Sequence, residues 1–439
     1  MTSNMKKIAV VGSGISGLAA AWLLARKHQV TLYEAQRHLG GHTNTVDVTV
    51  EGRTFPVDTG FLVFNRRTYP NLTALFGLLE VPLAESEMSF AASLAEPGIE
   101  WSGSSLATLF AQKRNLARPQ FWSMVRDILR FNRAATRLAE DAAELDLSLG
   151  GYLDRHGYGA PFRDWYLLPM AAAIWSCPTR QMLDYPLATF VRFCHNHGLL
   201  QIADRPQWLT VRGGGREYVR RLAAGLPDVR LATPVRRLLR KEAGVWVEAG
   251  AARERYDEVV LACHSDQALR LLGVDASADE RSVLAAVRYQ SNRALLHTDA
   301  ELLPRRRAVW SAWNYAAGRG HPDTRPVSVT YLINRLQPLP VSTPVLVSLN
   351  PFVEPRAAQV IAEFQYDHPV FDHGAIAAQQ RLESIQGRRR TWYCGAWSGY
   401  GFHEDGLKSA LAVAQAFGVR APWQGGDAVS SAAGWREAA

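Results

Sequence analysis

The stretch that decides the fold of this chain is Lys6–Glu34, which reads KKIAVVGSGISGLAAAWLLARKHQVTLYE. The apolar run Lys6–Val11 predicts a short buried strand, and Leu18–Arg26 is rich in strong helix formers. Gln29–Tyr33 has the pattern of a second strand, which Glu34 ends. A strand, a glycine-rich turn, a helix and a second strand in this order predict a parallel β-α-β unit of an α/β domain.

The turn itself has the spacing GxGxxG, which is typical of Rossmann-like dinucleotide-binding domains. Gly12 permits the tight turn, Gly14 lets the backbone approach a pyrophosphate, and Gly17 lets helix and strand pack closely. Glu34, 20 residues after Gly14, can accept hydrogen bonds from ribose hydroxyls. Ordinary glycine-rich turns share these letters, but the flanking strands and the acid favour a nucleotide. The predicted contacts are Gly12, Gly14, Ile15, Ser16, Gly17 and Glu34.

A second pair of glycines follows the acid, in Gly40-Gly41-His42-Thr43. Two glycines followed by small polar residues suit a second backbone contact to a pyrophosphate. A hairpin over 46–57 then leads to Asp58-Thr59-Gly60. We therefore add Gly40, Gly41, His42 and Thr43 to the predicted cofactor contacts.

The segments GSGISGLAAAWLL, LGGHTNTV and VDTGF together resemble the flavin-containing amine oxidase and phytoene desaturase superfamily. The resemblance implies FAD as cofactor, which accounts for two phosphate-contacting glycine patches in one chain. No cysteine or histidine stands in an obvious attachment motif, so we expect FAD to be held non-covalently. The family pattern implies FAD contacts at Asp58, Thr59, Gly60 and, on the adenine side, Val235.

The C-terminal segment 391–417, TWYCGAWSGYGFHEDGLKSALAVAQAF, resembles the last FAD-binding element of the superfamily. There a helix N-terminus faces the flavin, whose reduced form the helix dipole stabilises. We expect the helix to begin near Asp405 or Gly406, with Asp405 or Glu404 as its cap. The resemblance implies that Gly395, Gly406 and Leu407 contact FAD.

HLGGHTNTV, the run 310–315 and CGAWSGYGFHEDGL resemble one branch more closely, the FAD-dependent oxidoreductases that accompany cyclopropane-fatty-acyl-phospholipid synthases. That implies a lipid or fatty acyl substrate, linked to methylated or cyclopropane fatty acids, and a cyclopropane-synthase-like methyltransferase as partner. Desaturation and double-bond isomerisation are both open. Flavin amine oxidation, and a lipid-binding role beside a methyltransferase, are the alternatives.

The resemblance also predicts an amine-oxidase-like flavoprotein of two domains. We expect a Rossmann-like α/β FAD-binding domain assembled from residues 1–60, 205–270 and 390–420. An α+β substrate domain would comprise 61–204 and 271–389, with a tail over 421–439. Residues 62–205 carry helical spacing and many aromatic side chains, and we expect an apolar tunnel from 62–200 and 285–350 that leads to the flavin.

Two departures from amine oxidases stand out. Many of those enzymes place a lysine beside the flavin, whereas the matching region Arg288–Asp299 contains none. His42 also stands where the family usually has an arginine.

Two histidines are the predicted catalytic residues. His403 precedes the cofactor helix, where it could shuttle protons near neutral pH or hydrogen-bond FAD or backbone. His197 is expected to face the substrate channel. His195 and His197 form an HxH pair for which no third metal ligand can be argued, so we predict no metal site.

Composition bounds the class. Hydrophobic residues make up 47% and charged residues 21%, which excludes a disordered chain. The net charge of +8 favours anionic ligands, but the charges are dispersed and we expect no nucleic-acid partner. Cys177, Cys194, Cys263 and Cys394 are widely spaced and form no CxxC pair. No leader or membrane-spanning segment is expected, so we predict a cytoplasmic protein.

The sequence of one segment is compatible with peripheral contact with the inner face of a membrane. Residues Lys113–Arg133 alternate arginine with Phe121, Trp122, Ile128, Leu129 and Phe131. A basic amphipathic helix of this kind can lie on an anionic bilayer. It can equally be a core-facing helix with a solvated basic side.

Overall fold

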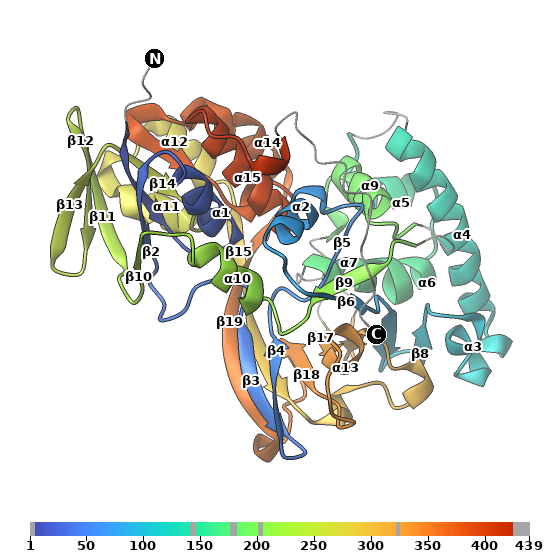
Figure 1. The fold of residues 1–439 in the computed structure, drawn as a ribbon. Helices are drawn as coiled ribbons and strands as arrows, with labels where there is room; N and C mark the ends of the chain where they lie inside the picture. The colour runs from blue at the N-terminus through green and yellow to red at the C-terminus, as the bar shows by residue number, and fades with distance from the viewer. Residues whose placement is uncertain (1–4, 141–145, 176–181, 201–204, 322–324, 425–439) are drawn as a thin grey trace.

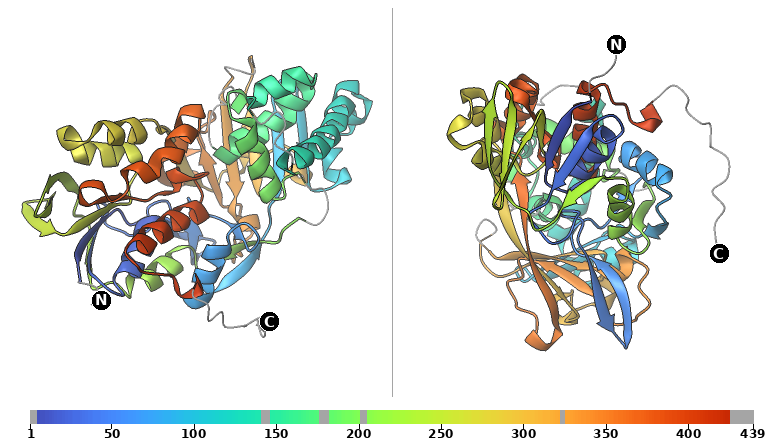
Figure 2. Two further views of the ribbon diagram at one scale, coloured as in Figure 1. Left: turned by 90° about the horizontal axis from the view of Figure 1, so that it is seen from above. Right: turned by 60° about the vertical axis from the view of Figure 1, so that its left-hand side comes forward.

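The computed structural model describes residues 5–140, 146–175, 182–200, 205–321 and 325–424. Cys177 and most of the predicted tail lie outside these ranges. A nucleotide-binding part surrounds a parallel sheet, and a second part combines a large mixed sheet with a group of helices (Figure 1). The small sheet of residues 235–256 and the helices of residues 119–196 lie at opposite ends of the molecule (Figure 1, and Figure 2, left). The predicted α/β two-part architecture is confirmed.

Five parallel strands form the nucleotide sheet, in the order β10-β2-β1-β14-β20. Ile8 and Val10 of β1 join one apolar cluster, and Ala9 and Val11 join another. Successive residues of a strand point to opposite faces, so this strand is buried on both sides, which explains its unbroken apolar run. The strands are β1 (Lys7–Val11), β2 (Gln29–Tyr33), β10 (Asp228–Arg230), β14 (Glu258–Leu261) and β20 (Thr391–Tyr393).

Layers of helix and sheet cover both faces of the nucleotide sheet. One face packs against α1 (Ile15–Leu24) and α15 (His403–Ala416), with α10 (Arg216–Ala223) beside them. The other face packs against a three-stranded antiparallel sheet and three helices. These are β11 (Val235–Lys241), β12 (Gly244–Ala249), β13 (Ala252–Tyr256), α11 (Ser265–Leu272), α12 (Ala278–Leu284) and α14 (His373–Arg381). By packing, α12 and α14 therefore accompany the nucleotide sheet, although the predicted bounds place them with the substrate domain.

A buried ionic network joins these layers. The Arg240 guanidinium on β11 is 1% exposed and donates to Glu280 of α12, to Asp275 and to the Asp275 carbonyl. The Glu280 carboxylate also accepts from the Tyr393 hydroxyl on β20 at 2.7 Å. Each buried charge thus has a charged partner and further hydrogen bonds, the condition under which a buried ion pair is tolerated.

The second part is built on a seven-stranded sheet in the order β19-β15-β18-β17-β16-β7-β8. All neighbours are antiparallel except β16 and β7. The strands are β7 (Phe90–Leu94), β8 (Ile99–Ser102), β15 (Arg288–His297), β16 (Trp313–Ala317), β17 (Val327–Leu332), β18 (Leu346–Leu349) and β19 (Val360–Val370). A hairpin of β3 (Thr45–Val50) and β4 (Arg53–Asp58) and a sheet of β5 (Phe64–Asn65), β9 (Trp208–Val211) and β6 (Leu83–Ser86) join the two parts.

Helices enclose one end of this sheet. Phe131 of α4, Phe162 of α6 and Phe190 of α9 are at most 1% exposed and belong to one apolar cluster. This packing confirms the aromatic helical region. The helices of this group are α3 (Leu106–Leu109), α4 (Pro119–Glu140), α5 (Leu149–Arg155), α6 (Ala160–Phe162), α7 (Leu168–Trp175) and α9 (Leu187–Asn196). Two further helices lie outside the group: α2 (Pro70–Leu78) packs on α15, and α13 (Ile333–Leu336) follows β17. Within the described ranges, no helix has the length and apolar content needed to cross a bilayer.

Candidate cofactor and substrate site

The first glycine turn has the geometry that its spacing predicts. Gly12 has φ of +101°, and its N–H donates to the Tyr33 carbonyl oxygen at 2.8 Å, which closes the turn against β2. A Cβ on Gly17 would lie 1.8 Å from the Gly12 carbonyl oxygen, so only glycine fits there. A Cβ on Gly14 would meet no protein atom within 4 Å, because this residue faces open space before α1.

Glu34 and the second glycine pair close around this turn. The Glu34 carboxylate accepts hydrogen bonds from the N–H and the hydroxyl of Ser13 at 2.9 and 2.6 Å. The Gly40 N–H donates to the Ser13 carbonyl oxygen at 3.1 Å. A Cβ on Gly41 would lie 3.2 Å from the Gly14 Cα. The two glycine-rich segments therefore form one continuous wall.

A cavity of about 1750 Å³ opens in front of this wall. Thr233, Val235 and Arg236 line it at the edge of the parallel sheet, and the start of α15 lines it near the helices. Both predicted catalytic residues, His197 and His403, are on its wall. The predicted cofactor contacts on the wall are Gly12, Gly14, Ile15, Ser16, Glu34, Gly40, Gly41, His42, Gly60, Val235 and Gly395.

Three predicted contacts support the wall from behind. The Asp58 carboxylate accepts hydrogen bonds from the Gly215 N–H at 2.9 Å and the Gln337 side-chain amide at 2.9 Å, and burial raises its pKa to about 6. The Thr59 Oγ1 and the Tyr366 hydroxyl oxygen are 2.7 Å apart and form a hydrogen bond. Asp58, Thr59 and Thr43 do not line the cavity. The polar atoms of Asp58 and Thr59 join the hairpin to the glycine loop after β9 and to β19, whereas the Thr43 hydroxyl contacts the Tyr218 hydroxyl and the His403 Nε2.

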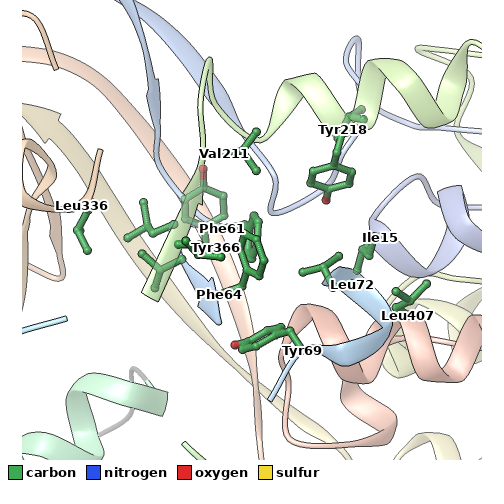
Figure 3. Packing of buried hydrophobic residues seen from close by; sticks show 14 of the residues in the cluster. Ile15, Phe61, Phe64, Tyr69, Leu72, Val211, Tyr218, Leu336, Tyr366 and Leu407 are labelled. Atoms are coloured by element: carbon green, nitrogen blue, oxygen red, sulfur yellow. The ribbon is translucent and has the colours of Figure 1, made fainter. Parts of the chain in front are cut away.

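The N-terminus of α15 also differs from the prediction. The helix begins at His403, and the Gly406 N–H donates to the Phe402 carbonyl oxygen at 3.0 Å, so this N–H is already used inside the helix. Gly406 instead allows close packing, since its Cβ would lie 2.7 Å from the Ser16 Oγ. Leu407 lies in the core with Ile15 and Leu72, where α15, α1 and α2 meet (Figure 3).

Asp405 or Glu404 was expected to cap α15, and in the structure both carboxylates cap a helix. The Asp405 carboxylate accepts a hydrogen bond from the Phe402 N–H at 3.0 Å and caps α15 itself. The Glu404 carboxylate accepts from the N–H groups of Asn71 and Leu72 at 3.2 and 3.0 Å, and therefore caps α2.

His403 lies between the glycine wall and the helices. Its ring stacks on Phe61 with centroids 3.7 Å apart, and its Nε2 lies 2.9 Å from the Thr43 Oγ1 and 3.1 Å from the Tyr218 hydroxyl. Burial lowers the pKa of His403 to about 3. The expectation of a pKa near neutrality is therefore wrong for this environment, whereas the alternative of a hydrogen-bonding histidine agrees with these contacts.

His197 ends α9 and faces the cavity. Its ring stacks on Phe193 at 4.0 Å, its Nδ1 lies 3.0 Å from the Phe193 carbonyl oxygen, and burial lowers its pKa to about 4. Among the residues that the structure describes, no cluster of three histidine, cysteine, aspartate or glutamate side chains could hold a metal ion.

The same cavity also has an aromatic part, which many large side chains line. Trp101 and Tyr166 lie 5.7 Å apart between ring centroids, and Trp175 and Phe193 lie 4.7 Å apart. We define the aromatic chamber as the wall formed by Phe90, Trp101, Tyr166, Met170, Ile174, Trp175, Phe193, Leu199, Trp208, Trp313 and Tyr331. All of these residues except Trp208 come from the segments in which the apolar tunnel was expected, 62–200 and 285–350. Trp208 lies on β9, just beyond the first of these segments.

A histidine cluster on the wall was not foreseen. The His42 ring lies 5.8 Å from that of His264 and 5.5 Å from that of His368. His42 was predicted from its position after the glycines, whereas His264 follows β14 and His368 lies on β19. No spacing in the sequence connects these three residues, since only the fold brings them together.

The family model of flavin containing amine oxidoreductases matches residues 15–291, which is more than half of the chain.

The chain belongs to the flavin containing amine oxidoreductase family.

The individual proteins that resemble this chain over most of its length share less than 30% sequence identity with it. A carotenoid phi-ring synthase of Streptomyces griseus is 28% identical over 323 residues, which span 65% of this chain and 58% of that protein. The CLA-producing fatty acid isomerase from P. acnes shares the fold with a TM-score of 0.67 at 16% identity, covering 95% of this chain and all of that one. Cyclohexylamine oxidase from Brevibacterium oxydans has a TM-score of 0.64 at 17% identity, covering 94% and 100%.

Members of the family bind FAD, and the residues of this flavoprotein fit that cofactor. Open space before Gly14 lies at the start of α1, where helix N–H groups favour phosphate. The buried Nε2 of His42 has no hydrogen-bond partner among the described residues, so the wall holds a polar atom that a ligand can satisfy. The adenosine would lie between Val235 and Glu34, the pyrophosphate at the two glycine segments, and the flavin toward Gly395 and His403.

His42, which stands where the family resemblance implies an arginine, lies on the wall. The arginines on the wall are Arg205, Arg236, Arg270 and Arg335, and no lysine lines it in the described ranges. Cys263 lies on the wall, but burial raises the pKa of its thiol to about 12, so it is a poor nucleophile. This fits the predicted non-covalent FAD.

Proposed function

We propose that this flavoprotein is an oxidoreductase that acts on a lipid acyl chain, by desaturation or by double-bond isomerisation. The observation that carries the proposal is the aromatic chamber, which is part of the same cavity as the nucleotide wall. Each methylene of an acyl chain that moves from water to such a wall contributes about 0.8 kcal/mol. A chamber of large apolar side chains therefore suits a long unbranched chain.

The charged groups near the chamber support the same class of substrate. Glu87 and Arg335 pair with each other, with N–O distances of 2.6 and 2.9 Å. Glu34 is held by Ser13 at the other side of the cavity. Glu85 and Asp367 also line the cavity, but the residues that define the aromatic chamber include no carboxylate. An acyl chain needs no charged partner there, whereas an ammonium group would have to be bound outside the chamber.

Burial of the two histidines bears on the type of reaction. Bound FAD supplies an acceptor for a hydride. Desaturation of an acyl chain also removes a proton and so requires a base, whereas isomerisation returns the hydride to the same chain. With pKa values of about 3 and 4, His403 and His197 are weak bases at pH 7. We therefore assign both side chains the role of orienting the substrate and excluding water. Desaturation would need another base on the wall, where Glu87 and Asp367 are candidates, and isomerisation would not.

The relatives include proteins of both substrate classes. A fatty acid isomerase and a carotenoid ring synthase are named for lipids, and a cyclohexylamine oxidase for an amine. The fold therefore admits either class, and the chamber favours lipid. The resemblance to proteins that accompany cyclopropane synthases extends the proposal: the acyl double bond handled here would be one that a methyltransferase uses or produces.

The test is an anaerobic visible spectrum of the FAD-bound protein, before and after addition of monounsaturated fatty acids or phospholipids, with product analysis by gas chromatography. Bleaching of the flavin band and a diene product would support desaturation. An unchanged band with a displaced double bond would support isomerisation. Unchanged lipid, together with hydrogen peroxide release from an amine in a parallel assay under air, would overturn the proposal in favour of amine oxidation.

A further inference from the structure

The region that carries the inference is an exposed face on the outer edge of the helical part, formed by residues 106–133. It comprises α3, the turn Lys113–Ala117 and the first half of α4, which lie together on one side of the molecule (Figure 1). None of these residues lines the cavity. We refer to the exposed side chains of residues 106–133 as the basic-apolar face.

Large apolar side chains stand out from this face into solvent. Leu106 is 77% exposed, Leu116 52%, Trp122 48% and Leu129 37%. The Trp122 ring is held in place, since its Nε1–H donates to the Leu116 carbonyl oxygen at 2.9 Å and the ring lies 5.1 Å from that of Phe110. An indole fixed outward with its N–H satisfied presents an apolar surface to whatever covers it.

The helix α4 has two distinct sides. Phe121, Met124 and Phe131 are at most 1% exposed and pack in the core, as the core-facing alternative predicts. The opposite side carries the exposed residues Trp122, Arg126, Leu129, Arg130 and Arg133 at helical spacing. The core-facing alternative therefore accounts for only one side of the helix, and the other side alternates apolar and basic residues.

Positive charge is in excess on this face. Residues 106–133 contain six basic side chains and one acid, Asp127, which is 2% exposed and lies 3.6 and 3.7 Å from the side-chain nitrogens of Arg126 and Arg130. Arg114 and Arg118 donate to the backbone carbonyls of Gly98 and Pro97, which satisfy hydrogen bonds without neutralising charge. Exposed Arg305 and Arg307 follow on the neighbouring segment, which contacts α3. The basic residues are Lys113, Arg114, Arg118, Arg126, Arg130 and Arg133.

The face adjoins the substrate cavity. Trp101 and Gly103 line the cavity, and Gly103 is exposed to solvent. Leu106, the most exposed apolar residue of the face, is three residues further along the chain. A surface that covered Leu106 would therefore lie beside the cavity wall at Gly103.

We propose that the basic-apolar face docks on an anionic lipid bilayer, with Leu106, Leu116, Trp122 and Leu129 inserted among the acyl chains and the arginines at the phosphate groups. The combination of apolar side chains with basic ones on one helix side is the pattern that binds such interfaces. The proposal that this face binds a bilayer depends only on the exposure and charge of its side chains. The further step, in which the protein takes its substrate from the bilayer past Gly103, rests on the proposed function.

The test is co-sedimentation of the full-length FAD-bound protein with vesicles of phosphatidylcholine mixed with phosphatidylglycerol, compared with vesicles of phosphatidylcholine alone. Two double variants probe the two components, Trp122→Ser with Leu129→Ser and Arg126→Gln with Arg133→Gln. Each should weaken partition onto the mixed vesicles by at least tenfold, and added salt should weaken wild-type binding. The thermal midpoint and flavin spectrum of each variant should match the wild type.

A control variant removes two arginines and one exposed apolar side chain at the opposite end of the molecule, with Arg237→Gln, Arg253→Gln and Val274→Ser. These residues are exposed, Val274 by 88%, and lie near the β11–β13 sheet. The control should bind vesicles as the wild type does.

Several results would overturn the inference. Equal vesicle binding by all variants would place the contact elsewhere. Absence of vesicle binding, with a larger hydrodynamic size that Trp122→Ser reduces, would assign the face to a second copy of the chain. Failure here is distinguishable from failure of the proposed function: dispersed fatty acid would still be converted in the first case, whereas vesicle binding without lipid conversion would contradict the proposed function alone.

Discussion

At the scale of single residues, the three glycines of the first turn do different work. Gly17 is required by contact, because its Cβ would overlap the Gly12 carbonyl oxygen at 1.8 Å. Gly14 has an ordinary φ of −62° and open space where a Cβ would lie. Only a ligand needs Gly14 to be small.

We therefore expect Gly14→Ala and Gly17→Ala to separate binding from folding. Gly17→Ala should destabilise the protein by about 1–3 kcal/mol or more through overpacking. Gly14→Ala should leave the apo protein within about 0.5 kcal/mol of the wild type but weaken FAD binding. Chemical denaturation and FAD titration measure the two effects. Equal FAD affinity of Gly14→Ala and wild type would show that no phosphate approaches this residue.

The low pKa of His403 makes stability depend on pH. The unfolded imidazole titrates near 6.5 and the folded one near 3, so the unfolded state binds more protons between these values. The stability that neutral His403 contributes is present above pH 6.5 and is lost as the pH falls toward 3, by up to about 1.4 kcal/mol per pH unit. Asp58 and Asp405, with pKa values raised by burial to about 6, act in the opposite direction below pH 6.

Because these effects overlap, the comparison must be between variants. From pH 7 to pH 5, apo His403→Gln should lose less stability than the wild type by up to about 1.4 kcal/mol per pH unit. Urea denaturation at several pH values measures the difference, with exposed His373→Gln as control. Parallel curves for His403→Gln and wild type would mean that the folded imidazole titrates normally.

At the scale of elements, α15 organises a neighbouring helix as well as the cavity. Glu404 is 4% exposed and satisfies the first N–H groups of α2 at Asn71 and Leu72. The sequence identifies α15 from its glycines and apolar spacing, and it identifies the acids as caps. It does not show that one acid caps a helix more than 300 residues away, because that contact exists only after folding.

Removal of this cap should destabilise the protein. We expect Glu404→Ala to cost about 1–3 kcal/mol, since the N–H groups of α2 lose a charged acceptor in a buried place. Glu354→Ala removes an exposed carboxylate that pairs with Arg293 at 2.6 Å and should cost less than about 1 kcal/mol. Guanidinium denaturation measures both. Similar losses for the two variants would refute a capping role for Glu404.

At the scale of the whole molecule, the nucleotide wall and the aromatic chamber form one cavity. The wall comes from strand ends of the parallel sheet, and the chamber from helices and the mixed sheet. A ligand of the chamber can therefore reach a cofactor on the wall without crossing solvent. The segments that build the chamber are separated along the chain by the strands of the nucleotide sheet.

Filling the chamber should change substrate length without affecting FAD. Met170 lies on α7 and lines the chamber. We expect Met170→Trp to lower kcat/KM for long acyl chains at least tenfold relative to short ones, with unchanged FAD affinity, because the larger ring occupies space that the end of the chain needs. Phe352→Trp, on an exposed residue, is the control. An equal loss for all chain lengths would indicate that the chamber does not measure length.

The sequence by itself determined the β-α-β unit, the two glycine-rich segments and the family, because each depends on residues that are close together in the chain. Strand, turn and helix between Lys7 and Tyr33 follow from local pattern and steric rules. The family resemblance also implied FAD contacts at Asp58 and Gly406. In the structure, these two residues lie beside the wall and do not line the cavity.

Only the tertiary structure decided the chemistry of the site. It placed His264 and His368 beside His42, buried His403 until its pKa fell to about 3, and joined the chamber to the nucleotide wall. The physical reason is that protonation, cavity shape and the partners of a polar atom depend on which distant segments exclude water from it. Those contacts form between segments hundreds of residues apart, and no spacing along the chain records them.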